Sequence, residues 1–424
     1  MNNIYTVAGA DAQGQLYQDP GLAAVGRSGE IIRPLPCGEW IPLPVGSSLA
    51  LLPGRAALGT DKRGRLRRAR ASTRSGVEGE LYAVAALLPM GYVRTYLPAA
   101  VAKPEATPLP LFGYTAVCFY RGQLYAAASR VEPDNTSWDP RHYNTPDLQV
   151  RIAQALRQRP GNRILVHLAH CALRYGCFTA QNIFYGRWEG GVPVSPVCNA
   201  RCRGCISKQV SQGCPSPQER ISFIPSVEEI TAVAVPHLVT ADDAIISFGQ
   251  GCEGEPTLMG DLLVQGVEAV RARTAAGLIN INTNGSRPHV IRALARAGLN
   301  SIRVSLISPL PEIFNAYVRP WGYSLQEVKE TLRIAAGEGL TTSLNYLIFP
   351  GVSDREEEVA AVLDLLHRHP VDLVQLRNLN IDPDKYMKII PPRRGRLLGI
   401  RGLCARLQSE FPQMQVGSFT HRAP

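Results

Sequence analysis

The chain is poor in lysine and has no long uninterrupted apolar run. Only six of its 45 basic residues are lysine. The most apolar stretch, residues 81–102, contains Arg94 and is broken by prolines and a glycine, whereas a spanning helix needs about 20 mostly apolar residues. The first residues, Met1-Asn2-Asn3, show neither the basic stretch nor the apolar core of a secretion signal. We therefore expect a cytoplasmic protein without a membrane segment.

Size and composition are those of a globular protein. The 424 residues are 45% hydrophobic and 19% charged, which excludes disorder of the whole chain and allows two or three domains. Ten cysteines occur without a secretion signal. Cysteines in such a chain indicate metal or redox chemistry more often than disulfides.

Positive charge is concentrated in the first part of the sequence. Residues 1–185 carry +8 of the total net charge of +10. Most of this excess comes from one run, namely Lys62, Arg63, Arg65, Arg67, Arg68, Arg70 and Arg74. Such a run can bind RNA, DNA or an acidic peptide, or it can be a solvated loop. Because no aromatic residue interleaves with the run, bases have no stacking platform there, and nucleic acid is possible but not favoured.

Three cysteines share one short segment with the spacing Cys-x3-Cys-x2-Cys. They are Cys198, Cys202 and Cys205. Three thiolates on one loop can hold three corners of a [4Fe–4S] cluster and leave the fourth iron open to a small molecule. The alternative is a structural zinc ion, for which Cys214 would be the fourth ligand.

Other cysteines offer weaker signals. Cys214, Cys252 and Cys404 either ligate a second cluster or are packing thiols, and packing is favoured because they are not compactly arrayed. Cys252 is also a candidate hydrogen donor or covalent partner in catalysis.

A further group of histidines and cysteines precedes the triad. It comprises His167, His170, Cys171 and Cys177. These residue types suit a metal, but their offsets along one helix do not converge on a single ion, so we expect a buried structural role.

The first 145 residues predict a β-rich domain. Short strands are expected at Glu39–Pro44, Leu81–Leu88 and Thr115–Ala128, the last with a hairpin turn at Gly122. A helical connector at residues 146–185 follows, with a helix over Asp147–Gln158.

From residue 186 onward, apolar strands alternate with amphipathic helices, as in parallel βα units. The expected strands are Val192–Val197, Ala244–Phe248, Leu278–Thr283, Ser301–Leu306, Thr342–Ile348 and Leu373–Asn378. Capping boxes are expected at Ser226/Glu229, Ser324/Glu327 and Ser353/Glu356, and helix exits at Gly277, Gly298 and Gly339. The pattern predicts an α/β fold in which six strands fit a partial or full barrel over residues 186–392, with a C-terminal helix and strand in residues 393–424. Our interpretation is a partial (βα)6 TIM-like barrel.

Polar and glycine motifs follow the predicted strands in order. They are the cysteine triad, Gly254-Glu255-Pro256, Thr283-Asn284-Gly285, Ser305 and Pro350-Gly351. This set, across residues 190–390, resembles the radical S-adenosylmethionine (radical SAM) superfamily. The resemblance departs at two positions, because Gly204 stands where an aromatic residue is usual and Glu253 replaces the first glycine of the Gly-Gly-Glu-Pro motif.

The resemblance implies cofactors and roles. A [4Fe–4S] cluster on the triad would bind S-adenosylmethionine (SAM), and one electron from a donor such as ferredoxin or flavodoxin would yield a deoxyadenosyl radical that abstracts hydrogen. Gly254, Glu255 and Pro256, with Thr283, Asn284 and Ser305, would contact SAM. The substrate would be an unknown small molecule or a peptide or protein side chain. Arg319 and Arg377 are candidate grips for a carboxylate or phosphate, or else form salt bridges.

Two alternatives to a radical SAM enzyme that acts on a small molecule, peptide or protein remain. One is an RNA-modifying radical enzyme that uses the basic run, and the other is a non-enzymatic iron–sulfur or zinc scaffold.

Overall fold

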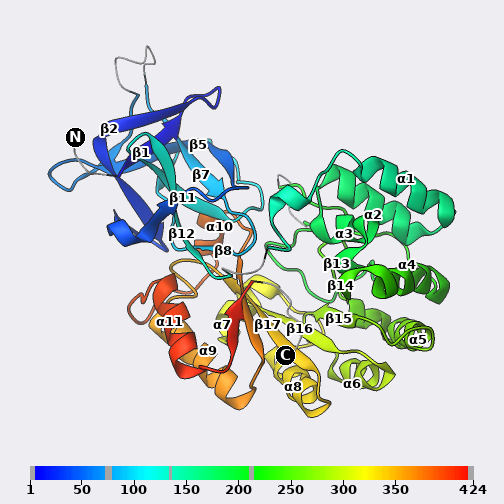
Figure 1. Ribbon diagram of the computed structural model, residues 1–424. Coiled ribbons are helices and arrows are strands. Elements are labelled where there is room, and N and C mark those ends of the chain that lie inside the picture. The colour runs from blue at the N-terminus through cyan, green and yellow to red at the C-terminus, as the bar shows by residue number, and fades with distance from the viewer. Residues whose placement is uncertain (1–4, 72–78, 133–135, 210–213, 419–424) are drawn as a thin grey trace.

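The computed structural model describes residues 5–71, 79–132, 136–209 and 214–418. Along these ranges the chain forms a β-rich N-terminal domain, three connecting helices and a curled parallel sheet covered by helices (Figure 1). Arg74 of the basic run lies outside the described residues.

The N-terminal domain is one antiparallel sheet system. Its strands are β1 (Thr6–Ala10), β2 (Leu16–Ser28), β3 (Ile31–Pro34), β4 (Trp40–Pro42), β5 (Ser48–Thr60), β6 (Leu66–Arg68), β7 (Tyr82–Leu87), β8 (Tyr92–Arg94), β9 (Leu97–Pro98), β10 (Ala100–Ala102), β11 (Tyr114–Tyr120) and β12 (Gln123–Arg130). The predicted hairpin is confirmed as β11–β12, where Gly122 takes a positive φ of 78° that a side chain would disfavour. Its interior is rich in alanine, which lets the strands pack closely.

Three helices join this domain to the parallel sheet. They are α1 (Leu148–Gln158), α2 (Arg163–Arg174) and α3 (Phe178–Tyr185). The helix predicted from Asp147 is α1, and Asn162 caps α2 by accepting a 3.0 Å hydrogen bond from the Leu165 amide.

The parallel sheet is a half-barrel with its strands in sequence order. They are β13 (Arg187–Gly191), β14 (Asp242–Phe248), β15 (Leu278–Thr283), β16 (Ser301–Leu306), β17 (Thr341–Ile348), β18 (Leu373–Asn378) and β19 (Gln415–Gly417). Five of the six predicted strands are present within one or two residues of their expected ends. The strand of the C-terminal segment, β19, pairs parallel with β18 and extends the sheet to seven strands.

The predicted strand at Val192–Val197 is wrong. The first strand is β13, which ends at Gly191, and only the Val192 amide continues the pairing, with a 3.0 Å bond to the Ser247 carbonyl. The Val194 and Ser195 amides donate to the Glu253 carboxylate and not to a neighbouring strand, and Pro193 and Pro196 have no amide hydrogen to donate. The segment therefore leaves the sheet and leads into the cysteine loop.

Helices return the chain between successive strands. They are α4 (Val227–Thr240), α5 (Gly260–Arg271), α6 (Pro288–Ala297), α7 (Pro311–Val318), α8 (Leu325–Gly337), α9 (Glu356–Arg368), α10 (Pro383–Met387) and α11 (Ile400–Glu410). Capping boxes at Ser226 and Ser324 are confirmed. The one predicted at Ser353 is wrong, because α9 begins after Arg355 and the Ser353 hydroxyl accepts from the Phe349 amide instead. Among the described residues, no helix has the length and apolarity to cross a membrane.

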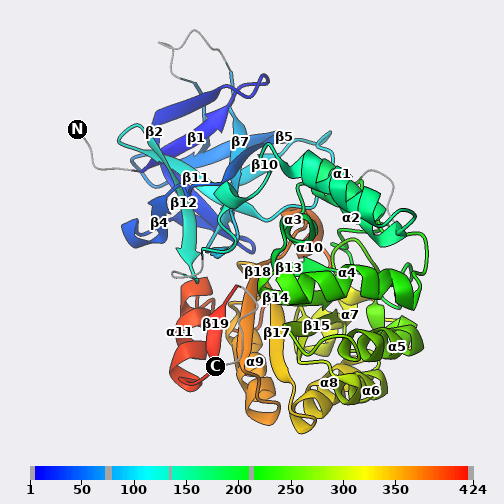
Figure 2. The same cartoon turned by 45° about the vertical axis from the view of Figure 1, so that its right-hand side comes forward.

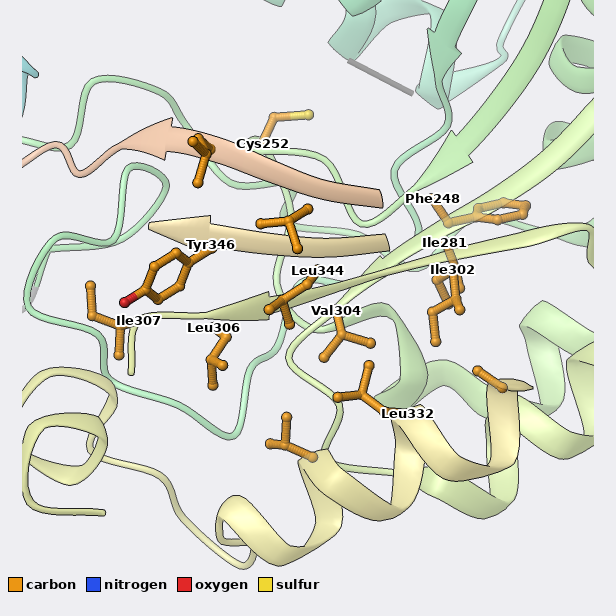
Figure 3. Close-up of a cluster of buried hydrophobic side chains, with 14 of the residues drawn as sticks. Phe248, Cys252, Ile281, Ile302, Val304, Leu306, Ile307, Leu332, Leu344 and Tyr346 are labelled. Carbon is orange, nitrogen blue, oxygen red and sulfur yellow. The ribbon is translucent and has the colours of Figure 1, made fainter. Parts of the chain in front are cut away.

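The two faces of the half-barrel differ in polarity. Ile302, Val304 and Leu344 belong to the face that packs against helices, where Leu332 of α8 meets them (Figure 3). Alternate residues such as Arg303 and Asn345 occupy the opposite, concave face, because side chains along a strand alternate between faces. The concave face is therefore polar, unlike the packed apolar interior of a closed barrel.

The N-terminal domain lies against the ends of the last strands of the half-barrel (Figure 2). Fully buried Arg94 donates to the Leu379 carbonyl at 2.8 Å, just beyond β18. Buried Arg55 forms an ion pair of 3.0 Å with Asp382. Beyond β17, the Gly29 amide donates to the Pro350 carbonyl at 3.0 Å. The domain thus covers one side of the edge where parallel barrels place their active groups.

Candidate functional site

The cysteine loop follows β13 and is fixed by backbone pairing with the end of α7. Three hydrogen bonds join them, from the Arg201 amide to the Val318 carbonyl (3.0 Å), from the Arg203 amide to the Tyr317 carbonyl (3.0 Å) and from the Trp321 amide to the Asn199 carbonyl (2.8 Å). Arg319, with an exposed side chain and a φ of 51°, belongs to this turn. The sequence offered no signal for this pairing, which joins residues more than a hundred positions apart.

The three thiols of the loop influence one another. Burial, with smaller contributions from the Glu255 carboxylate and the Cys205 thiol, raises the pKa of Cys198 to about 11. Burial likewise raises the pKa of Cys202, with contributions from Cys198 and Cys205. Because the pKa values of the partly buried Cys198 and Cys202 thiols are raised, these groups need a cation to become thiolates, as a bound metal cluster provides.

The spacing of these thiols suits a cluster better than one ion. Within the described residues, one group of three metal-binding side chains has ligand atoms that all lie within 4.8 Å of one another, and it consists of His167, Cys171 and Cys252. The sulfur atoms of the triad do not meet this limit. A cubane attaches its cysteines to different irons and so tolerates wider separations than a single tetrahedral zinc ion. Cys214, the possible fourth zinc ligand, instead contacts the Leu109 carbonyl at 3.7 Å. The donor set therefore fits a [4Fe–4S] cluster with one open iron.

Gly204, the position at which an aromatic residue is usual, has no room for a side chain. A Cβ atom there would lie 2.6 Å from the Asn380 carbonyl oxygen and 2.7 Å from the Tyr317 hydroxyl. Buried Tyr317 thus fills the space beside Cys205 that a side chain at position 204 would otherwise take.

Glu255 connects two of the strand-end motifs. Its buried carboxylate accepts from the Thr283 hydroxyl at 2.5 Å and from the Asn284 amide at 2.7 Å. The Asn284 side chain in turn donates to Asn199, inside the cysteine loop, at 2.9 Å. Burial raises the pKa of Glu255, and its hydrogen bonds oppose this effect. The predicted SAM-contacting residues of β14 and β15 are therefore held together next to the cysteine loop.

Glu253 provides a second connection between loops. Its buried carboxylate accepts from four backbone amides, those of Val194, Ser195, Gly249 and Gln250, at 2.6–3.0 Å. Burial raises the pKa of this group to about 7, against the lowering effect of these donors. The residue that departs from the Gly-Gly-Glu-Pro pattern thus fastens the loop after β14 to the segment entering the cysteine loop.

Gly254 is required by a close backbone approach, which makes Gly254→Ala a sharp test. The Gly254 amide donates to the Ser195 carbonyl at 2.7 Å, and an added Cβ would lie 1.9 Å from the Val197 carbonyl oxygen. Overpacking of this kind costs about 1–3 kcal/mol. We expect SAM to bind the reconstituted variant about 5–100-fold more weakly, measured by equilibrium dialysis.

The matched control is Gly337→Ala, at a helical glycine whose Cβ would meet no atom within 4 Å. This variant is expected to bind SAM as the wild type does, and equal binding by both variants would contradict the role given to Gly254.

Arg220 places a positive charge beside a predicted cluster ligand. Its Nη2 donates to the Cys205 sulfur at 3.5 Å and to the Ser207 hydroxyl at 3.0 Å. Charge and hydrogen bonds at the ligating sulfurs set the potential of iron–sulfur clusters. Sequence reasoning passed over Arg220, which lies fifteen residues beyond Cys205.

Arg220→Gln is expected to make the midpoint potential of the cluster more negative by about 50–150 mV, because the reduced cluster loses a stabilising charge. Potentiometric titration followed by EPR measures this shift. Arg203→Gln, at an exposed side chain of the same loop, is the control and should leave the potential in place. An unchanged potential in Arg220→Gln would exclude the tuning role.

The structure also shows where the remaining predicted site residues lie. Pro256 begins a short 3-10 helix directly after Glu255. Ser305 lies on the concave face and accepts from the Asn345 side chain at 3.4 Å. Cys252 is buried and faces Cys171, a contact that raises the pKa of Cys252 and lowers that of Cys171 to about 5. In the described structure Cys214, Cys252 and Cys404 do not form a common ligand group.

The concave face contains buried polar atoms without protein partners. They are Arg303 Nε, Asn345 Oδ1, and both Gln375 Nε2 and Gln375 Oε1. Ser305, Asn345 and Gln375 are register neighbours on β16, β17 and β18. Arg303 also forms a buried ion pair with Glu189 of β13, at 3.3 Å. Desolvation and the charge of Arg303 lower the pKa of Arg377 to about 10, so Arg377 lies near this group.

The parallel half-barrel carries a three-thiol loop beyond its first strand and connected polar loops beyond the next two strands. This arrangement defines an enzyme with a metal-cluster cofactor. Residues 192–363 match the family model of the radical SAM superfamily. These residues, less than half of the chain, form a radical SAM domain. Its cofactors are those of the family, a [4Fe–4S] cluster and SAM.

Two curated proteins resemble the chain. It is 24% identical over 225 residues to molybdenum cofactor biosynthesis protein 1 of Bos taurus and 25% identical over 207 residues to the protein of that name from Mus musculus. These matches cover 51% and 46% of this chain but only 32% and 29% of the relatives.

Similar solved structures include methylornithine synthase, with a TM-score of 0.39 and 14% identity over 62% of this chain and 73% of that one. Coproporphyrinogen III oxidase from Escherichia coli has a TM-score of 0.38 and 14% identity, over 54% of this chain and 53% of that one.

Proposed function

We propose that this radical SAM enzyme abstracts hydrogen from a small polar molecule bound on the concave face of the half-barrel. The observation that carries the proposal is the set of unpartnered buried polar atoms on Arg303, Asn345 and Gln375. Buried polar groups without partners are costly, by about 1–3 kcal/mol each, so such sites bind water or a ligand. The set offers both donors and acceptors, which suits a molecule with amide, carboxylate or similar groups.

The position of the N-terminal domain favours a small substrate. Through Arg94, Arg55 and Gly29 it packs on the loops beyond β17 and β18. These loops adjoin the edge that holds the cysteine loop and the predicted SAM contacts. A folded macromolecule would have to displace this domain from its buried ion pair, whereas a small molecule would not.

The residues of the chain have distinct parts in this proposal. Cys198, Cys202 and Cys205 would hold the cluster, and Glu255, Thr283 and Asn284 would keep the SAM-binding loops in place beside it. When bound, the cluster and SAM supply one-electron chemistry that ends in removal of a hydrogen atom from substrate. Asn345 and Gln375 would orient that substrate.

Two further parts of the proposal concern the electron donor and the cellular location of the protein. An electron donor such as ferredoxin or flavodoxin would reduce the cluster. A reducing, cytoplasmic location would suit an oxygen-sensitive iron–sulfur cluster.

RNA is the second candidate substrate. The basic run has fewer arginines free to bind phosphate groups than its composition implies. Arg65 and Arg67 each contact Asp61 at 3.1 Å, and Arg68 contacts Glu80 at 3.0 Å. Intramolecular carboxylates therefore neutralise part of the run, of which residues 62–68 lie on the β5–β6 hairpin.

Replacing Arg65, Arg67, Arg68 and Arg70 together by Ala is expected to leave affinity for RNA within about twofold of wild type, measured by filter binding at physiological salt. A large loss of RNA affinity would favour the RNA-modifying alternative.

The experiment for the small-molecule proposal uses extracts of cells grown in heavy water. Ultrafiltration separates metabolites from protein and RNA, and mass spectrometry follows deuterium transferred into 5′-deoxyadenosine. We expect transfer from the metabolite fraction only, and its loss in Gln375→Leu while cleavage of SAM without substrate persists. Transfer from the protein or RNA fraction alone would overturn the proposal.

A further inference from the structure

Three metal-binding side chains meet outside the cluster site. They are His167 and Cys171, one turn apart on α2, and Cys252 in the loop after β14 (Figure 3 shows Cys252). Their ligand atoms all lie within 4.8 Å of one another, and Cys171 Sγ is 3.4 Å from His167 Nε2. Cys171 and Cys252 are buried, while His167 is partly exposed at the rim.

The separations match those of a tetrahedral ion. Zinc binds cysteine sulfur at about 2.3 Å and histidine nitrogen at about 2.0–2.1 Å, which places the two ligand atoms about 3.5 Å apart at a tetrahedral angle. Two thiols and one imidazole form a soft ligand set that favours zinc over magnesium or calcium. The partly exposed rim leaves a path by which an ion can enter.

We propose that His167, Cys171 and Cys252 bind a zinc ion distinct from the [4Fe–4S] cluster. Three protein ligands leave the fourth position for water or for a nearby group.

Such an ion would connect two parts of the chain that are distant in sequence. Helix α2 belongs to the connector before the half-barrel, whereas Cys252 precedes the Gly254–Glu255 motif by two residues. The same loop is held by Glu253, and the Cys252 carbonyl accepts from the Ile221 amide at 2.9 Å. Zinc would thus fasten the connector helices to the loop that carries the predicted SAM contacts, which makes it a positioning site.

The first test counts zinc and iron separately by mass spectrometry in full-length protein purified under nitrogen with a reductant. We expect about one zinc ion per chain in the wild type. The Cys198→Ala, Cys202→Ala, Cys205→Ala variant should keep this zinc while losing its iron. Cys171→Ser with Cys252→Ser should lose zinc and keep the iron, and Cys404→Ser is the matched control that keeps both.

A second measurement guards against misfolding of the buried variants. Zinc affinity of His167→Asn, changed at a partly exposed residue, is expected to fall at least about 10–100-fold in a competition assay with a chelator. Cobalt in place of zinc should give the intense visible absorption of a tetrahedral thiolate site in the wild type but not in the Cys171→Ser, Cys252→Ser protein.

Absence of zinc from the wild type, or zinc retained by the Cys171→Ser, Cys252→Ser protein, would overturn the proposal. So would a Cys171–Cys252 disulfide found by peptide mapping after purification under reductant, because the pair would then be a redox bond. All of these readouts are independent of SAM cleavage.

Discussion

A Cys202→Ala protein is expected to leave anaerobic reconstitution without a [4Fe–4S] cluster and to form no 5′-deoxyadenosine above the level of buffer. Cys202 lies between Cys198 and Cys205 in a loop held by pairing with the end of α7. With two thiolates left, two irons of the cubane have no protein ligand. Iron and sulfide analysis measures the cluster, and chromatography measures the product.

Cys214→Ala is the matched control for this loss. Its thiol is buried, but it contacts the Leu109 carbonyl and not the triad. The control should retain both cluster and SAM cleavage. A full cluster in Cys202→Ala, or loss of the cluster in Cys214→Ala, would contradict the assignment of the triad.

Arg94→Met is expected to lower the free energy of unfolding by about 2–6 kcal/mol, because two buried carbonyls lose the guanidinium donor at a cost of about 1–3 kcal/mol each. The side chain of Arg94 is fully buried and donates to the Leu379 and Tyr114 carbonyls at 2.8 and 3.3 Å. Its guanidinium also lies over the Phe349 ring, 5.1 Å from the centroid. Methionine fills part of the space but leaves both carbonyls without a donor.

Urea denaturation measures this change, and Arg63→Met is the control at an exposed arginine of the same domain. A surface substitution of this kind should stay within about 0.5 kcal/mol of wild type. A small effect of Arg94→Met would mean that the N-terminal domain is not fastened to β18 through this residue.

Much of the half-barrel could be predicted because its signals are local. The strands Leu278–Thr283, Ser301–Leu306 and Leu373–Asn378 have the predicted bounds, since each is a short segment with buried apolar residues at alternate positions, preceded by a turn. The same local signals identified the capping boxes at Ser226 and Ser324. They misled at Val192–Val197, where apolar residues alternate with prolines that cannot pair.

The parts that could not be predicted depend on distant contacts. In the sequence, Glu253 is only a departure from a motif. In the structure, its carboxylate accepts hydrogen bonds from four backbone amides of two separate loops. His167 and Cys171 do not form a metal site on their own helix, and only the fold brings Cys252 to them. Likewise, the polar concave face emerges from strand register, which a single sequence does not specify.

The central claim, that this chain is a radical SAM enzyme with its cluster on Cys198, Cys202 and Cys205, is tested most directly by one assay. Reconstituted wild-type protein is incubated with SAM and dithionite under nitrogen, and 5′-deoxyadenosine is measured beside the variant in which all three cysteines are Ala. The account predicts product from the wild type and none from the variant. A wild-type protein that holds its cluster, forms no 5′-deoxyadenosine and shows no change in the EPR signal on adding SAM would contradict it.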